Sequence, residues 1–387
     1  MTQPIHIVMT PTRNEAWVIR AFLESTIRWA DYVIICDQFS TDGTREIVAE
    51  YAEQTATLTT VGPSSDVGPS SDVGPSSDVG PSLDVGPSLD VGPSSTVGSS
   101  STVGKKRAEV ILIDNPNTEF NEAERQRILV AKAREVAAGR DTLLWGLDAD
   151  ELLAANAFST DDWQKIMHSN PGAVFWFKWA QLMYDKKHYY NNHDSYPWLF
   201  HDDGVEPHGN YVRTMHSMRI PYPLDEHDMT YVEDFRVLHL GPAPLNRVKA
   251  KERFYMFVDW QVNHRPPYSL GRAYIGSNTY PKEQFDLPQE WIYTKEKDGW
   301  SFWENVELDE THCWMDDYIY ERLDKYPMKT LAKLQIWTPE FLEYYHIKDP
   351  RPWYVKLVHL YIDKTRSNRR NILVRAIDKA LRKFVKN

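Results

Sequence analysis

Apolar runs alternate with amphipathic stretches through the first part of the chain. I-H-I-V-M-T (5–10) is a short β-rich run, and D-Y-V-I-I-C-D (31–37) is continuously apolar, as in strands buried on both faces. The stretch that follows Ala16 has apolar residues at helical spacing, and a second helix is predicted to begin at Arg45. This order predicts a parallel α/β sheet that binds its ligands at the carboxyl ends of the strands.

The same alternation returns further along the chain. A third strand is predicted over 108–114, a long amphipathic helix over 120–139, and a fourth strand from Asp141 to L-D-A-D-E (147–151). Later apolar runs predict strands within 173–180 and 233–242, and the region after Pro242 is helical and aromatic. We therefore expect an α/β fold with a mostly parallel, Rossmann-like sheet, helices on both faces and a helical C-terminal region.

Seven hexads based on V-G-P-S-S-D interrupt this pattern at 61–102. Their composition predicts a flexible surface insertion, and the recurrence of Val every six residues leaves a hexapeptide β-helix as the alternative. Proline in six of the seven hexads argues against the β-helix, because each proline removes a hydrogen-bond donor from the ladder. We expect three regions: an α/β domain at 1–245 with an insertion at 61–104, a helical region at 246–350, and a basic amphipathic tail at 351–387.

Charge and cysteine content narrow the class of protein. The net charge of −11 argues against a general nucleic-acid binder. Two cysteines cannot form a disulfide framework, and neither a signal peptide nor a membrane-length apolar run is present, so we expect a cytoplasmic protein. The tail holds 11 Lys and Arg against 2 Asp and Glu, a charge of +9 that leaves −20 for the remainder. It is expected either to lie on an anionic membrane surface or to pack on the acidic domain.

Two carboxylates flank one alanine at the exit of the fourth strand. Asp148 and Asp150 would repel each other unless a cation lies between them. Hard oxygen ligands suit Mg²⁺ or Mn²⁺, and a partly filled coordination shell leaves places for phosphate oxygens. The alternative is a helix N-cap beside a surface carboxylate. We expect a metal ion with a bound diphosphate.

The exits of the first two strands carry polar loops that face the same edge of a parallel sheet. In P-T-R-N-E, Thr12, Arg13 and Asn14 can donate hydrogen bonds to a base or a phosphate. Glu15 and Asp37 can accept from a base imide or a ribose hydroxyl. Asp42, in the S-T-D-G turn, is either a further nucleotide-sugar ligand or an ordinary capping residue.

The three loops together resemble those of the family 2 glycosyltransferases, which have the GT-A fold. The matching segments are P-T-R-N-E-A, D-x-x-S-T-D-G-T-x-x-I and L-D-A-D-E, within about residues 1–151. V-L-H-L-G (237–241), followed by K-A-K-E-R-F-Y (249–255), resembles a segment of bacterial cell-surface glycan glucosyltransferases of that family. M-H-S (215–217) is similar to their H-E, with Ser217 in place of Glu.

The resemblance implies a nucleotide-diphosphate sugar as donor, with UDP as the expected nucleotide, a glycan or lipid-linked saccharide as acceptor, and inverting transfer. Asp37 would contact the base, Asp148 and Asp150 the ribose and metal, and His239 the metal or the diphosphate. His239 also ends an apolar strand and precedes a basic cluster, and a neutral imidazole is a common ligand.

A carboxylate is needed to remove the proton from the acceptor hydroxyl. Glu233 and Asp234 are the first candidates, followed by Glu151 and Asp225. Arg127, together with Arg125 on the long helix, could reach a phosphate, although an exposed arginine is the common outcome. Lys251 and Arg253 would either neutralise the diphosphate or lie on a solvated helix face.

Two other functions fit parts of the pattern. A sugar-phosphate nucleotidyltransferase would share the fold, but its first loop is normally rich in glycine, and P-T-R-N-E has none. A non-catalytic glycan-binding protein would allow Ser217 and the insertion, whereas the intact D-A-D argues against it.

Overall fold

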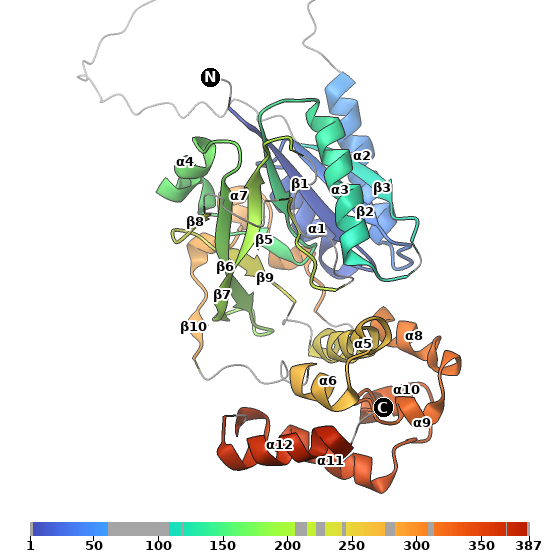
Figure 1. Cartoon of the computed structure of the whole chain (residues 1–387). Helices are drawn as coiled ribbons and strands as arrows, with labels where there is room; N and C mark the ends of the chain where they lie inside the picture. Colours follow the sequence, from blue (N-terminus) through green and yellow to red (C-terminus); the bar gives the residue numbers. More distant parts are fainter. Residues whose placement is uncertain are drawn as a thin grey trace, which may run out of the picture.

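One mixed sheet and a mainly helical region beside it make up the chain (Figure 1). The computed structural model describes residues 3–60, 108–117, 119–205, 215–221, 229–241, 245–274, 283–308, 313–368 and 370–384. The hexad repeats and Asp225 lie outside the described residues. Within the described part, ten strands form a single sheet, whose main path has the order β3-β2-β1-β4-β7-β6-β9-β5.

The parallel half of this sheet confirms the four strands predicted first. It contains β3 (Glu109–Asp114), β2 (Tyr32–Asp37), β1 (Ile5–Thr12) and β4 (Thr142–Gly146), all paired in parallel. Thr12 is in register with Asp37, and Met9 with Gly146. The carboxyl ends of β1, β2 and β4 therefore lie at one edge of the sheet, as the sequence predicts.

The second half of the sheet contains antiparallel pairs. Its strands are β5 (Glu151–Leu153), β6 (Val174–Leu182), β7 (His188–His201), β8 (Met229–Tyr231), β9 (Val237–His239) and β10 (Phe285–Asp286). β7 joins the halves because it pairs antiparallel with both β4 and β6. β9 runs parallel to β6 and antiparallel to β5, which sets His239 in register with both Gln181 and Glu151.

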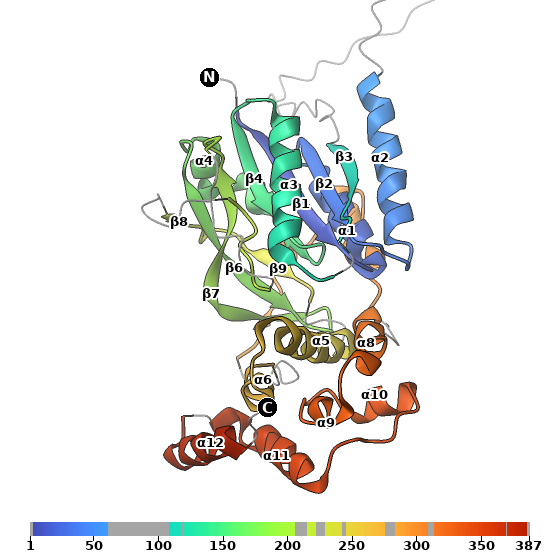
Figure 2. The same ribbon diagram turned by 45° about the vertical axis from the view of Figure 1, so that its right-hand side comes forward.

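Helices cover both faces of the parallel half, as expected. α1 (Ala16–Thr26) packs on the face that carries Val8 and Trp145, and α3 (Glu122–Ala137) on the face that carries Ile7 and Met9 (Figure 2). This alternation follows from the two-residue period of a strand. The other elements around the sheet are α2 (Thr44–Thr60), η1 (Ala157–Ser159) and α4 (Asp161–Met167).

The C-terminal part has a hydrophobic core of its own. That core is built on α5 (Leu245–Asn263) and includes Phe254, Phe257, Tyr318 and Trp337. The elements around it are α6 (Pro267–Tyr274), α8 (Trp314–Tyr320), η4 (Leu323–Lys325), α9 (Met328–Leu331), α10 (Pro339–Tyr344), α11 (Trp353–Lys364), η5 (Arg366–Asn368) and α12 (Ile372–Phe384).

The segment before α8 does not belong to that helical core. It contains η2 (Gln289–Trp291), α7 (Lys295–Asp298) and η3 (Trp303–Asn305). Its side chains, such as Tyr293 and Phe302, join the core of the sheet instead. The chain therefore returns to the sheet once within the region expected to be helical. Across the described residues, no helix combines the length and the apolar character needed to cross a membrane.

Candidate active site

Asp37 ends β2 and organises the second loop from a buried position. Its Oδ1 accepts hydrogen bonds from Ser40 Oγ at 2.6 Å and from Thr12 Oγ1 at 3.0 Å, and its Oδ2 accepts from the Ser40 amide at 3.1 Å. Arg45 lies 3.7 Å from the same carboxylate. Thr12 and Asp37 are thus brought together, and their hydrogen bonds fix the exits of β1 and β2.

Asn14 joins the first loop to the second. Its backbone has φ of 54°, a left-handed conformation that asparagine tolerates better than most residues. Its amide donates to Ser40 Oγ at 2.8 Å, and its Oδ1 accepts from the Thr41 amide at 2.7 Å. This pair of bonds makes the two loops one rigid unit.

Asp42 was expected to be either a nucleotide-sugar ligand or a capping residue, and its hydrogen bonds are those of a capping residue. Its carboxylate accepts from the amide and hydroxyl of Thr44, at 3.0 and 2.6 Å, and from the Ala16 amide at 3.0 Å. It therefore fixes the beginnings of both α1 and α2.

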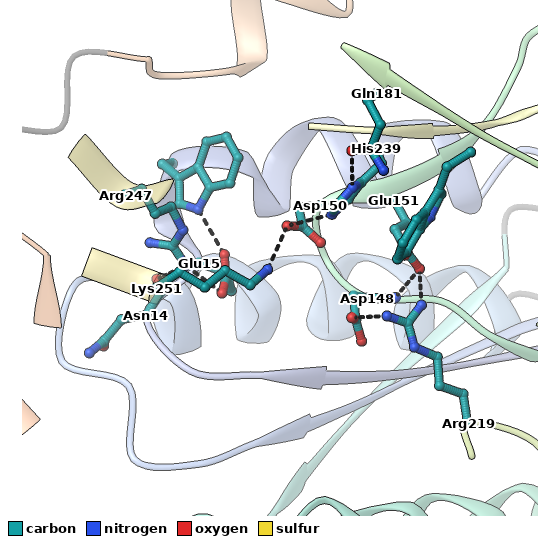
Figure 3. Close-up of polar contacts among 12 residues, drawn as sticks. Asn14, Glu15, Asp148, Asp150, Glu151, Gln181, Arg219, His239, Arg247 and Lys251 are labelled. Carbon is teal, nitrogen blue, oxygen red and sulfur yellow. Dashed lines mark hydrogen bonds and ion pairs between the residues drawn. The ribbon is translucent and has the colours of Figure 1, made fainter. Parts of the chain in front are cut away.

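Glu15 links the first loop to α5. Its carboxylate accepts from Trp17 Nε1 at 2.7 Å and from Arg247 at 2.5 Å (Figure 3). Burial raises the pKa of Glu15 to about 7, although the Arg247 guanidinium opposes that rise and nearby Asp150 adds to it. Because Arg247 is itself buried, the pair fixes α5 to the sheet.

Asp148 and Glu151 share one arginine that the sequence did not single out. Arg219 donates to Asp148 Oδ2 and to Glu151 Oε2 (Figure 3). Glu151 is completely buried and also accepts from Trp179 Nε1 at 2.9 Å and from the Asp148 amide at 3.0 Å. Burial raises the Glu151 pKa, and Arg219 opposes the rise. Glu151 therefore holds the turn in place and is not free to accept a proton from a substrate.

A glycine allows Arg219 to come this close. A Cβ on Gly146 would lie 2.7 Å from Arg219 Cβ and 2.8 Å from its carbonyl oxygen. The segment that carries Arg219 therefore packs directly against the backbone at the end of β4. Nothing in the local sequence around Arg219 predicts this contact, because it depends on the distant glycine.

Asp150 faces His239 and Lys251 (Figure 3). Its Oδ2 lies 3.4 Å from His239 Nε2 and 3.9 Å from Lys251 Nζ. Burial by itself would raise the Asp150 pKa, but the nearby Lys251 and His239 outweigh burial and lower it. Desolvation lowers the pKa of Lys251, but Tyr255, Asp150, Asp148 and Glu15 together outweigh it and raise the pKa. Asp150 is thus a carboxylate and Lys251 an ammonium at neutral pH.

His239 is oriented as metal-binding histidines commonly are. Its Nδ1 lies 2.6 Å from Gln181 Oε1, and a carbonyl oxygen only accepts, so Nδ1 donates. When the ring is neutral, Nε2 then has a lone pair on the side of Asp150. The lowering of the Asp150 pKa by His239 belongs to the protonated ring, whose Nε2 donates to the carboxylate. A Cβ on Gly241 would lie 2.5 Å from Nε2 and 3.0 Å from Asp150 Oδ2, so this glycine keeps the space beside both atoms open. Two facing ligand atoms with open space beside them fit a divalent cation.

Among the described residues, side chains alone do not complete a metal site. In the part of the chain that the structure describes, no group of three His, Cys, Asp or Glu residues is arranged to hold a metal ion. Asp148, which the sequence grouped with Asp150 and His239, is paired with Arg219 instead. Asp150 and His239 are thus the two predicted ligands that the structure brings together.

Two cavities meet at this cluster. The smaller, of about 90 Å³, is lined by Arg13, Glu15, Gln38, Arg125, Asp148 and Asp150 among others. The larger, of about 410 Å³, is lined by His239, Gly241, Gln181, Tyr190, Asn192 and Tyr274 among others. Lys251 and Tyr255 line both. One ligand could therefore lie across the two cavities, or two ligands could meet there.

Arg13 reaches the smaller cavity from a stacked position. Its guanidinium lies 4.5 Å from the ring centre of Trp314 and 5.6 Å from that of Tyr318, and burial lowers its pKa. Arg125 lines the same cavity, whereas Arg127, the arginine that the sequence favoured, lies on the exposed side of α3.

Glu233 and Asp234 do not join the cluster. They precede β9, and His239 ends it, so they lie toward the opposite end of the strand. Lys178 Nζ donates to Glu233 at 2.6 Å, and the Asp162 amide donates to Asp234 at 3.1 Å. These contacts hold the loop before β9 against β6 and α4. Neither Glu233 nor Asp234 therefore lies beside the cluster, where a residue that takes the proton from the acceptor hydroxyl is needed.

Comparisons with known proteins agree with the first two loops. The family model described as Glycosyl transferase family 2 matches residues 7–61, which span β1, α1, β2 and α2. No curated protein matches the sequence. The crystal structure of S. aureus TarS 1–349 is similar at 11% identity and a TM-score of 0.33, with 94% of this chain and 91% of that chain covered. That TM-score is too low for the likeness to support an argument.

The family match confirms the resemblance to family 2 glycosyltransferases for the part of the chain that it covers. It supports a glycosyltransferase as the class of enzyme. The α/β sheet with helices on both faces, followed by a helical C-terminal region, agrees with that class.

Proposed function

We propose that this glycosyltransferase binds a nucleotide-diphosphate sugar in the smaller cavity and transfers the sugar to a hydroxyl group in the larger one. The main support for this function is that the two cavities meet at Asp150, His239 and Lys251. His239 Nε2 and Lys251 Nζ each lie within 4 Å of Asp150 Oδ2, at 3.4 and 3.9 Å. A reacting centre placed there would contact both cavities.

The smaller cavity offers three cations to a diphosphate, although four carboxylates (Glu15, Glu122, Asp148 and Asp150) also line it. Arg13, Arg125 and Lys251 line it and can donate to phosphate oxygens. Gln38 lines it beside the end of β2, although its amide nitrogen already donates to the backbone oxygens of residues 117 and 119, at 2.8 and 3.1 Å. Asp37 itself is held by the loop, so in our proposal it shapes the base site from beneath. We expect UDP as the nucleotide.

Asp150 and His239 would hold a divalent cation, Mn²⁺ or Mg²⁺. Mg²⁺ sites commonly use one or two protein ligands and take the others from substrate phosphates and water. When bound, the ion would supply a Lewis acid beside the leaving diphosphate. Asp148 would contact the ribose or the ion from its place beside Arg219.

Lys251 would act on the leaving group directly. As a partly exposed ammonium between the cavities, it can donate to an oxygen of the diphosphate while negative charge develops there. Its position is fixed by α5, which the ion pair of Arg247 and Glu15 fastens to the first loop. The lysine needs no rearrangement to meet the charge.

The larger cavity suits a saccharide. Tyr190 and Tyr274 offer aromatic faces, and Asn192 and Gln181 offer amide groups that can bond hydroxyls. The acceptor hydroxyl would approach the sugar from the side opposite the diphosphate, which inverts the anomeric centre.

Glu252 would take the proton from that hydroxyl. Within the described residues it is the one carboxylate that lines the larger cavity. It follows Lys251 on α5, so base and leaving-group cation would be supplied by one helix. In this proposal Glu252 replaces Glu233 and Asp234, which the fold holds elsewhere.

The test is turnover with a panel of nucleotide sugars, with Mn²⁺ or with EDTA, for the wild-type chain and Asp150→Asn. The proposal expects sugar release from one donor, which EDTA and the substitution each reduce at least about a hundredfold. Pyrophosphate release from a nucleoside triphosphate and a sugar phosphate would indicate a nucleotidyltransferase instead. Binding of glycans with no turnover of any donor would indicate a non-catalytic protein.

A further inference from the structure

Two C-terminal helices expose apolar side chains that the described part of the protein does not cover. We use the term outer face for Trp353, Leu357 and Leu360 of α11 together with Ile372, Leu373 and Ile377 of α12. Trp353 is 73% exposed and Ile372 is 78% exposed. Exposed apolar groups gathered on neighbouring helices commonly mark an interaction surface.

The apolar residues of the outer face are not the ones by which α11 packs on the protein. In α11 the residues that are buried are Val355, His359 and Ile362, and at 100° per residue they lie on the side opposite Leu357. A helix that packs by one face is normally polar on the other. α11 is instead apolar on both sides, and the described residues cover only one of them.

α12 is also docked against the protein, through contacts with α6. Asp378 accepts from Arg272 at 2.7 Å and from Tyr268 Oη at 2.6 Å, both on α6. Val374 is buried on the side that Asp378 shares. The exposure of Leu373 and Ile377 therefore belongs to a docked helix.

The two helices form the outermost layer of the molecule. Both contact α6, and both views show them on the far side of α6 from the sheet (Figures 1 and 2). The end of α6 lines the larger cavity through Ala273 and Tyr274. The outer face thus lies one helix away from the cavity assigned to the acceptor.

The positive charge around α11 and α12 indicates what kind of partner the outer face binds. Residues 351–387 carry +9 while the rest of the chain carries −20. The two acidic residues of the layer are already engaged, Asp378 with Arg272 and Asp363 with Gln335 at 2.7 Å. Exposed lysines and arginines therefore surround apolar groups, a combination that binds anionic lipid headgroups and the acyl chains beneath them.

We propose that the outer face binds the surface of an anionic lipid bilayer. Trp353 and the Leu and Ile side chains enter the interface, and the surrounding cations, such as Arg375 and Lys379, contact phosphate headgroups. Taken with the proposed function, on which this last step rests, the surface points to a lipid-linked saccharide as the acceptor.

The test is sedimentation of the full chain with vesicles of phosphatidylcholine containing about one third phosphatidylglycerol. The apolar variant combines Leu357→Ser and Leu373→Ser. Its matched control combines Val205→Ser and Met229→Ser, which are similarly exposed on the sheet side. We expect the apolar variant to bind at least about tenfold more weakly than the wild type, and the control to bind as the wild type does.

The charge variant combines Arg375→Gln and Lys379→Gln, with Lys295→Gln and Lys297→Gln as its control. Loss of affinity is expected only for the first pair, and added salt should weaken the wild type. Absence of vesicle binding, or equal binding by all variants, would overturn the proposal. A dimer in sedimentation equilibrium that only the apolar variant loses, without vesicle binding, would assign the face to a second copy and also overturn it. No activity is measured, so the result is independent of the proposed function.

Discussion

His239 Nε2 and Asp150 Oδ2 face each other at 3.4 Å, although 88 residues separate them in the chain. β9 pairs with β5, and this pairing carries the histidine to the turn that contains the aspartate. Gln181 orients the imidazole from a third strand. The sheet, and not the local sequence, therefore assembles the two ligand atoms.

The glycine beside these atoms gives the first prediction. Gly241→Ala would place a Cβ 2.5 Å from His239 Nε2, so the ring or the backbone must move. We expect Mn²⁺-dependent donor binding to weaken at least about tenfold, measured by isothermal titration calorimetry.

Gly271→Ala is the control for that substitution. Its Cβ would meet Gln335 Oε1 at 2.9 Å in the helical core, and Gly271 itself lines neither cavity, so it creates similar crowding away from the two ligand atoms. Its donor affinity should equal that of the wild type. Equal losses of donor affinity in both variants would mean that Gly241 acts through stability alone.

The arginine paired with buried Glu151 gives the second prediction. Arg219→Gln leaves the fully buried Glu151 carboxylate without its cation, a change that typically costs about 3 kcal/mol of unfolding free energy. Urea unfolding at neutral pH measures the loss. Adding Glu151→Gln should recover at least about half of it, since the buried charge is then gone.

An exposed pair supplies the comparison. Arg20 and Glu50 lie 3.3 Å apart with both side chains about half exposed, so Arg20→Gln should cost no more than about 1 kcal/mol. A loss for Arg219→Gln no larger than this would contradict the role assigned to Arg219.

The raised pKa of Glu15 gives the third prediction, in the pH dependence of stability. Its pKa is about 7 in the folded chain and about 4.5 when unfolded, so the folded state holds the proton more tightly. The resulting stabilisation is complete below pH about 4.5 and is lost as the pH rises to about 7. Glu15→Gln cannot lose a proton, so its unfolding free energy should rise relative to the wild type over that range.

The expected relative gain is on the order of 1 to 3 kcal/mol between pH about 5 and about 8, from urea unfolding at intervals. Glu290→Gln, at an exposed site, is the control and should show no such trend. A difference between wild type and Glu15→Gln that does not change with pH would show that Arg247 keeps Glu15 ionised throughout.

The different roles proposed for Lys251 and Glu252, which are neighbours on α5, give the fourth prediction. Lys251→Met and Glu252→Gln alter neighbouring residues with different functions. Lys251→Met should weaken donor binding, because it removes a cation from the smaller cavity. Glu252→Gln should leave donor affinity unchanged and lower kcat at least about a hundredfold. Equal effects of the two substitutions on kcat and on donor affinity would refute the division.

Much of the fold could be predicted because the parallel strands are continuously apolar. I-H-I-V-M-T and D-Y-V-I-I-C-D form strands at the expected positions. β7 was missed because its sequence, H-Y-Y-N-N-H-D-S-Y-P-W-L-F-H, mixes polar residues and a proline with the aromatic ones. Its antiparallel pairing with β6, which includes bulges, overrides that local pattern.

Some residues of the candidate site could likewise be predicted from the sequence, and others could not. Asp148, Asp150 and Glu15 could be identified because loops at the ends of parallel strands must meet. Arg219 and Gln181 could not, since each reaches the cluster from a segment that gives no local signal. Glu233 and Asp234 were the first candidates for the base, but β9, a strand of three residues, separates them from His239 at its other end.

The most direct measurement is a thermal shift of the wild-type chain and of Asp150→Asn with nucleotide sugars, each with Mn²⁺ and with EDTA. At a donor concentration of 100 times its Kd, binding adds about 2.7 kcal/mol of stability. The proposed site predicts that one donor raises the melting temperature of the wild type only when Mn²⁺ is present, and that Asp150→Asn shows no such rise. The same Mn²⁺-dependent rise in both proteins would place the donor and its cation elsewhere and contradict the proposed site.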